Sequence, residues 1–345
     1  METTSHPDVI VVTGASSGIG RAVAIAAGSR GKRVALLSRN TGALEIAADQ
    51  IARAGGEALV LPVDVTDETA IDDAAIAVVH RWGRIDIWIN CAMATVFAPV
   101  SDITPAEFRR VTDVTYLGSV YGTLAALRQM RRQQEGVIVQ VGSTLAYRSI
   151  PLQSAYCAAK AALRGFTDSL RTELIHDHSP IRITMVQLPA VNTPQSIRQR
   201  NKMPQQAQPV PPMYAPEAIA DLILWAAEKT PREPLIGWPS VAALWGQKFI
   251  PGLLDRYLGA RGFASQFVDE PNSQNGRDIL FETLPGDPGM HGPYRDREHG
   301  PDLQMRLRPH FRAVGFGFGI ASLAFWQARK SVNGATEHSA SPGGS

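Results

Sequence analysis

Short apolar runs alternate with amphipathic stretches along the first 240 residues of the chain. The apolar runs are rich in β-branched residues and predict strands at 8–13, 33–38, 58–63, 85–90, 137–142, 182–188 and 235–238. Helical patterns lie between them, near 19–29, 41–54, 67–82, 104–133, 154–178 and 216–229. Strands that are apolar throughout are typical of a parallel sheet covered on both faces. We therefore predict a doubly wound α/β fold with a mostly seven-stranded parallel sheet and helices on both faces.

Two later segments depart from this alternation. Residues 190–216 are rich in proline and polar residues, which predicts a long loop of the kind that often forms a lid. Residues 240–263 have a helical pattern interrupted at Pro251-Gly252, and residues 268–302 are rich in Pro, Gly and charge and are expected to be irregular. We therefore divide the chain into a domain at 1–240, an extension at 241–311, helical and then irregular, and an apolar segment with a disordered tail at 312–345.

Composition and charge narrow the classes of function. The formal net charge of +2, without a dense block of Lys and Arg, argues against a nucleic-acid partner. The two cysteines, Cys91 and Cys157, cannot build a disulfide framework, and the chain does not start with the apolar stretch of a signal peptide, so we expect a cytoplasmic location. Histidine, cysteine and carboxylate side chains do not recur at metal-ligand spacing, so we expect no metal site.

A glycine-rich stretch, "TGASSGIG" at residues 13–20, follows the first predicted strand and opens the first predicted helix. Gly14, Gly18 and Gly20 allow a positive φ and a close approach of the backbone to a ligand. The N-terminus of a helix presents free N–H groups and the positive end of the helix dipole, which suits a pyrophosphate. The stretch therefore predicts a dinucleotide-binding loop; the alternative is a tight turn that binds nothing.

A second candidate site combines a tyrosine, a lysine and a serine. Tyr156 and Lys160 are four residues apart in a predicted helix, so both project from one face. A free tyrosine has a pKa of about 10, and a neighbouring ammonium group lowers that pKa toward neutrality. The hydroxyl of Ser143 could hold a substrate oxygen beside the phenol, and the tyrosine would then exchange a proton with it. The alternative is an ordinary surface pair on an amphipathic helix.

Together these motifs resemble the short-chain dehydrogenase/reductase (SDR) family. The glycine motif, the Y-x-x-x-K of "YCAAK" (156–160) and a serine thirteen residues before the tyrosine all match the family, over about residues 8–240. The resemblance implies a Rossmann fold and an oxidoreductase that interconverts a carbonyl and an alcohol on a small molecule, with Tyr156 as the acid/base. It also implies a homodimer or homotetramer, paired through the helices that contain 119–130 and 161–170.

The resemblance further implies a set of cofactor-binding positions. They are Gly14, Ser16, Ser17, Gly18, Ile19, Gly20, Ser38, Arg39, Asp64, Val65, Asn90, Tyr156, Lys160 and Thr193. In this set Asp64, with the Val65 backbone, would contact the adenine, and Thr193 would anchor the nicotinamide carboxamide. The alternatives are that Asp64 caps the next helix and that Thr193 is a turn residue.

The end of the second predicted strand bears on the choice of cofactor. The ribose 2′ position meets this point in dinucleotide folds, and an acidic residue there would accept from a 2′-hydroxyl. This chain has Ser38-Arg39-Asn40 instead, and Arg39 can donate two N–H groups to a phosphate. The sequence therefore favours NADP(H) over NAD(H), unless Arg39 is only a solvated charge.

Three positions depart from the family pattern. Met93 and Ala190 replace glycines, and Thr115 stands where the family has a catalytic asparagine that supports a water next to the lysine. These changes affect the expected proton relay and pocket shape. They leave a rival hypothesis open, in which the protein is a cofactor-binding scaffold or NADP(H) sensor with little turnover.

The segment 313–328, "AVGFGFGIASLAFWQA", contains sixteen residues without a charge. It is slightly shorter than the roughly 20 apolar residues that span a bilayer, and Trp326 beside Arg329-Lys330 suits a membrane interface. The sequence permits peripheral or tail-anchored membrane contact. The alternatives are a helix packed on its own domain and a disordered end.

Overall fold

The computed structural model of the protein describes residues 8–272, 274 and 276–307. Residues up to Asp302 belong to one compact unit, and the chain from Leu303 belongs to a second. Of the second unit the structure describes the short helix α11 (Leu303–Leu307). The segment 313–328 lies outside the described residues.

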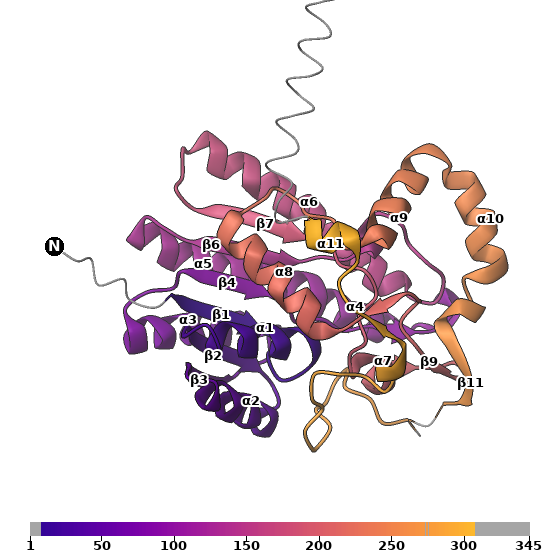
Figure 1. Cartoon of the computed structure of the whole chain (residues 1–345), viewed down its shortest axis with the longest axis horizontal. Coiled ribbons are helices and arrows are strands. Elements are labelled where there is room, and N and C mark those ends of the chain that lie inside the picture. Colours follow the sequence, from indigo (N-terminus) through magenta and orange to yellow (C-terminus); the bar gives the residue numbers. More distant parts are fainter. Residues whose placement is uncertain (1–7, 273, 275, 308–345) are drawn as a thin grey trace, which may run out of the picture. The chain divides into compact units, whose positions relative to one another are not determined.

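A parallel six-stranded sheet forms the centre of the first unit (Figure 1). Its strands, in spatial order, are β3 (Glu57–Pro62), β2 (Arg33–Ser38), β1 (Val9–Thr13), β4 (Ile87–Asn90), β6 (Val137–Val141) and β7 (Arg182–Val186). Every residue of β1, β4 and β6 is buried, as their continuous apolar runs predict. The strand order reverses between β1 and β4, which confirms the doubly wound, Rossmann-type fold.

The seventh predicted strand, 235–238, does not form. Leu235 makes a single parallel bridge to Gln187, and the Gln187 backbone bonds Pro234 and Ile236. Gly237 then adopts a φ of 76° and turns the chain into helix α9 (Trp238–Phe249). The segment 235–238 therefore makes a single bridge to the sheet and does not continue as a strand, because its last residue already begins a helix.

Helices cover both faces of the sheet (Figure 1). On one face α1 (Gly18–Gly28) packs between α2 (Thr41–Arg53) and α8 (Pro216–Lys229). The other face carries α3 (Glu68–Trp82), α5 (Gly118–Gln133) and α6 (Ser154–His176). All six helices follow the patterns predicted from the sequence.

The predicted helix 104–133 consists of three parts. It begins as α4 (Pro105–Thr112), whose N-terminus has a capping box between Thr104 and Glu107. A π-helical turn (Asp113–Leu117) follows and leads into α5. Such turns often occur at functional sites.

The proline-rich segment 190–216 contains only short elements: α7 (Gln195–Arg198), β8 (Arg200–Asn201), β9 (Gln205–Ala207) and β10 (Met213–Tyr214). These strands pair with β5 (Val96–Phe97), β11 (Phe267–Pro271) and β12 (Glu298–His299), respectively. The extension contributes α9 and α10 (Pro251–Arg261), separated at Ile250 as the Pro251-Gly252 pair predicts. The segment 190–216 is thus joined to the C-terminal extension by two small sheets.

The helices of the described chain do not reach the length and apolarity that a bilayer span demands.

Candidate active site

The glycine loop lies at the carboxyl ends of β1 and β2. Gly14 has a φ of 71°, and a side-chain carbon on it would come within 2.9 Å of the Ala92 Cα atom. A side-chain carbon on Gly20 would come within 2.3 Å of the Gly14 carbonyl oxygen. The Gly14 amide donates to the Leu37 carbonyl at 2.8 Å, which holds the loop against β2. The loop therefore needs glycine at these two positions.

A cavity of about 530 Å³ extends from this loop to the start of α6. The predicted site residues that line it are Gly14, Ser16, Ser17, Gly18, Ile19, Gly20, Ser38, Arg39, Asp64, Val65, Ser143, Tyr156, Lys160 and Thr193. One continuous cavity thus joins the glycine loop to the tyrosine, lysine and serine. This arrangement fits a dinucleotide with its phosphates at α1 and its reactive ring near Tyr156.

Tyr156 and Lys160 project from the first turns of α6, and Ser143 lies two residues after the end of β6. The ammonium nitrogen of Lys160 is 5.7 Å from the centre of the Tyr156 ring and donates to the Val141 carbonyl at 2.7 Å. The Ser143 hydroxyl accepts from the Leu145 amide at 3.1 Å, which orients it at the edge of the cavity.

Burial dominates the electrostatics of these groups. It raises the pKa of Tyr156, against the opposing effect of the hydrogen bond with Ser143. This direction is opposite to the one expected from the sequence, because the phenol is desolvated and the Lys160 ammonium donates to the Val141 carbonyl. Burial also lowers the pKa of Lys160 to about 8. Tyr156 is therefore a neutral proton donor at pH 7.

The two cysteines are not activated. Burial raises the pKa of the Cys91 thiol to about 11, with Lys160 opposing, and burial also raises the pKa of Cys157. Both thiols remain protonated at neutral pH, which argues against a redox role. Within the described part of the chain, no group of three His, Cys, Asp or Glu side chains is arranged to hold a metal ion.

Thr115 and Asn90 lie behind the cavity wall. The Thr115 hydroxyl is fully buried in the π-helical turn, where it donates to the Ala94 carbonyl at 3.0 Å and accepts from the Ala94 amide at 2.9 Å. Asn90 accepts from the Trp88 indole and donates to Thr123 and Gln140. Thr115 therefore fixes the Ala94 backbone and Asn90 joins buried side chains, so the polar atoms of both are already bonded within the protein.

The Arg39 end of the cavity carries an ion-pair network around Asp64. Asp64 accepts from Arg110 at 2.6 Å and from the Thr66 amide at 3.0 Å, and the Arg39 guanidinium lies 3.9 Å away. Burial alone would raise the pKa of Asp64, but Arg110 and Thr66 lower it. The cap of α3 is Asp67, which accepts from the Ala70 amide, so Asp64 is not the helix cap. Thr193 lies against the glycine loop, 3.1 Å from where a side chain on Gly18 would begin.

The extension supplies part of the cavity wall. Ala243 from α9 and Leu254 and Leu258 from α10 line it. Beyond β11, the irregular chain adds Ile279, Thr283, Leu284 and Pro288. The sequence of the extension contains no motif that marks these residues as part of a site.

A family model described as short chain dehydrogenase matches residues 8–204, more than half of the chain. The chain belongs to the short-chain dehydrogenase family. It is accordingly an NAD(P)-dependent oxidoreductase of the kind that acts on CH–OH and C=O groups.

This short-chain dehydrogenase is similar to other members over most of its length. The uncharacterized oxidoreductase YxnA of Bacillus subtilis (strain 168) is 32% identical over 329 residues, which cover 93% of this chain and 90% of the relative. That similarity extends beyond residue 204 into the C-terminal extension.

Two solved structures resemble this short-chain dehydrogenase. A short-chain dehydrogenase from Streptomyces avermitilis matches with a TM-score of 0.62 and 29% identity, covering 76% of this chain and 98% of the other. A metagenomic short-chain oxidoreductase in complex with NADP matches with a TM-score of 0.55 and 28% identity, covering 66% of this chain and 95% of the other.

Proposed function

We propose that the protein is an NADP(H)-dependent oxidoreductase that interconverts a carbonyl and an alcohol, with Tyr156 as the acid/base. The observation that carries this proposal is the single cavity that contains the glycine loop and Ser143, Tyr156 and Lys160. A scaffold that only binds the cofactor would not need the three catalytic groups in that cavity. The domain at 1–240 would hold this machinery, and the extension at 241–311 would complete its walls.

Each residue of the site has a separate role in this proposal. Ser143 holds the substrate oxygen, and Tyr156, a neutral phenol at pH 7, donates a proton to that oxygen during reduction. Lys160 holds the cofactor ribose and stabilises the phenolate that remains after the transfer. The dinucleotide would lie between the glycine loop, Asp64 and Thr193 and supply or accept the hydride at its nicotinamide ring.

The preference for NADP(H) rests on charge at the end of β2. Arg39 lines the cavity next to Ser38 there, and the carboxylate of Asp64, which also lines the cavity, is already bound by Arg110. A guanidinium has five N–H donors, and Arg39 uses two of them on backbone carbonyls. Its other donors remain for a 2′-phosphate. The NADP complex of the metagenomic relative supports this choice.

Replacing Tyr156 by Phe tests the acid/base role. Turnover should fall by about 10²-fold or more, because proton transfer by a positioned side chain contributes about that factor. The dissociation constant of NADPH should stay near the wild-type value. Oxidation of NADPH at 340 nm across a panel of aldehydes, ketones and quinones provides the assay. Wild-type protein that binds NADPH yet reduces none of these compounds would support the sensor hypothesis instead.

A second part of the proposal is self-association through α5 and α6. A groove between these helices is lined by Leu124, Leu127, Phe166 and Leu170, with Arg128, Arg131 and Glu173 at its polar edges. Such a mixed surface suits a two-fold interface in which each helix meets its own copy. Sedimentation at micromolar concentration should give a dimer or tetramer, and a lone monomer would refute this part.

A further inference from the structure

The chain crosses the cofactor side of the cavity once more after β11. Residues 278–289 are here named the strap, and Ile279, Thr283, Leu284 and Pro288 of the strap line the cavity that contains the glycine loop and Arg39. Leu280 is the one residue of the strap that is fully buried, while Phe281, Glu282 and Thr283 are exposed. Apolar burial therefore contributes little to holding the strap in place.

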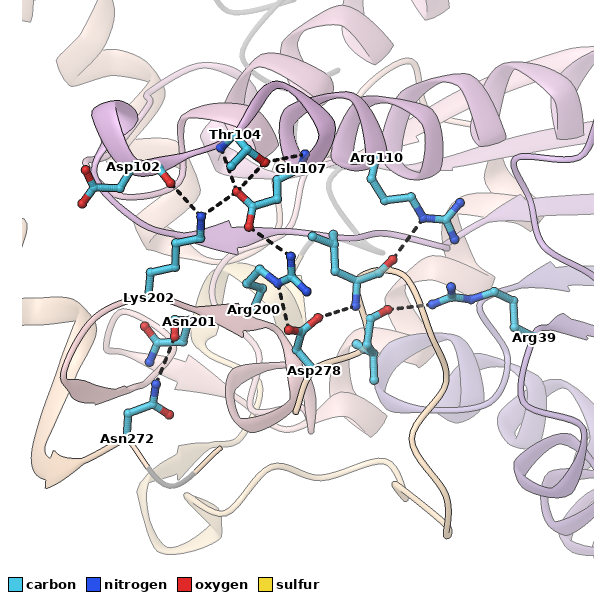
Figure 2. Close-up of polar contacts among 12 residues, drawn as sticks. Arg39, Asp102, Thr104, Glu107, Arg110, Arg200, Asn201, Lys202, Asn272 and Asp278 are labelled. Atoms are coloured by element: carbon cyan, nitrogen blue, oxygen red, sulfur yellow. Dashed lines mark hydrogen bonds and ion pairs between the residues drawn. The ribbon is translucent and has the colours of Figure 1, made fainter. Parts of the chain in front are cut away.

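The first half of the strap is held through its backbone carbonyls (Figure 2). Arg39 donates to the Ile279 and Phe281 carbonyls, each at 2.7 Å. Arg110 donates to the Leu280 carbonyl at 3.0 Å. These are the two arginines at the ribose end of the proposed NADP(H) site.

The second half is held in the same way. The Gly18 amide, at the N-terminus of α1, donates to the Gly289 carbonyl at 3.1 Å. The Leu284 carbonyl accepts from Asn40 at 3.3 Å and from Arg198 at 3.2 Å. Carbonyl and phosphate oxygens are both hydrogen-bond acceptors, so these strap contacts use the class of donor that also holds a dinucleotide phosphate.

A buried ion network anchors the start of the strap. Asp278 accepts from the Arg200 Nε atom at 2.8 Å, and Arg200 also donates to Glu107 at 3.0 Å. Lys202 donates to the same Glu107 carboxylate at 2.7 Å (Figure 2). The side chains of Asp278 and Glu107 are 8% and 6% exposed, so water screens these pairs weakly. The other Asp278 oxygen accepts from the Leu280 amide at 2.9 Å, which sets the backbone direction of the strap.

A second ion pair anchors the end of the strap. Asp287 accepts from both terminal nitrogens of Arg21, the residue directly after the glycine motif. Arg21 is 1% exposed, and its Nε atom donates to Gln50 at 3.1 Å. The strap is therefore fixed at both ends by charge and between them by carbonyls.

We propose that the strap is the gate of the cofactor site, with Asp278 and Asp287 as positioning residues that hold it closed over the bound dinucleotide. The cofactor enters and leaves when the strap lifts, and the closed strap holds Arg39 toward the ribose. This inference rests on the proposed function, because it requires NADP(H) in the cavity.

Stopped-flow fluorescence of NADPH tests the gate without substrate. Asp278→Asn and Asp287→Asn each remove one anchor charge and should raise the association and dissociation rate constants of NADPH about tenfold. Asp278→Glu keeps the charge, so its association and dissociation rate constants should stay close to the wild-type values. Glu282→Gln is the matched control, since it removes the same charge from an exposed strap position outside both anchors. Thermal unfolding of each variant without cofactor separates gating from a loss of fold.

Hydrogen exchange in the wild-type protein provides a second measurement, which needs no variant. NADPH should slow the exchange of backbone amides in peptides that cover 278–289. Rate constants within twofold of wild type in folded anchor variants, or strap exchange that NADPH leaves unchanged or accelerates, would overturn the gate. Wild-type protein that does not bind NADPH at all would instead overturn the proposed cofactor, and the gate with it.

Discussion

Lys160 should make the cofactor-free protein less stable at neutral pH than at alkaline pH. The side chain is 2% exposed, and burial lowers its pKa from 10.5 to about 8. In the unfolded chain the lysine keeps its proton up to about pH 10.5. Between pH 8 and 10.5 the unfolded state thus binds more protons, so the free energy of unfolding rises with pH in this window. A pKa lowered from 10.5 to about 8 corresponds to roughly 3 kcal/mol.

Replacing Lys160 by Met removes this dependence. At pH 7 the variant no longer buries a charge, but it loses the bond to the Val141 carbonyl, which contributes about 1.5–3 kcal/mol. The two effects largely cancel at pH 7. Between pH 7 and pH 10 the free energy of unfolding of the wild type should rise by roughly 2–3 kcal/mol relative to the variant, since most of the titration lies in that interval.

Urea unfolding at pH 7 and pH 10, without cofactor, measures the effect. Lys229→Met, the same replacement on the exposed end of α8, is the control and should differ from wild type by the same amount at both pH values. If the difference between wild type and Lys160→Met changes by less than about 0.5 kcal/mol over this range, burial does not shift the lysine as argued.

Three further predictions concern the surroundings of the site. Arg39→Ala should reduce the affinity for NADPH relative to NADH by about 1.5–3 kcal/mol, and unchanged ratios of the two dissociation constants would exclude contact with the 2′-phosphate. Thr115→Val should lower the free energy of unfolding by about 2–4 kcal/mol because it frees both Ala94 backbone groups, whereas Thr115→Ser keeps the hydroxyl and should lower it less. Glu107 has a pKa lowered to about 2: burial opposes this shift, and Lys202, Thr104 and Arg200 outweigh it. The stabilisation by the ionised Glu107 is therefore complete above about pH 4.5 and is lost as the pH falls toward 2. Glu107→Gln should lower the free energy of unfolding by about 3 kcal/mol at pH 7 and by less at pH 3, as measured by urea unfolding.

The sheet and its helices were predictable because buried parallel strands are apolar throughout. The run at 235–238 has the same appearance, and only the left-handed turn at Gly237 stops it from continuing as a strand. The π-helical turn at Asp113–Leu117 was not predictable, because one extra residue in a turn leaves the local apolar pattern of 104–133 nearly unchanged.

The candidate site was predictable where side-chain identity determines the chemistry. The glycine loop, Ser143, Tyr156 and Lys160 all line the cavity. The strap was not predicted from the sequence, because it is held through backbone carbonyls, which every residue possesses. The pKa of Tyr156 is raised, whereas the sequence predicted a lowered pKa, since desolvation by the folded chain cannot be inferred from a four-residue spacing.

The pair between Arg21 and Asp287 has a consequence for protein synthesis. The two residues are 266 positions apart, so at about 5–20 residues per second the ribosome adds Asp287 roughly 15 to 50 s after Arg21. During that time α1 cannot bury the Arg21 guanidinium at its final position without leaving most of its charge unpaired, which costs about 3 kcal/mol. The Arg21 side chain can therefore reach its final, paired state only after Asp287 has been synthesised.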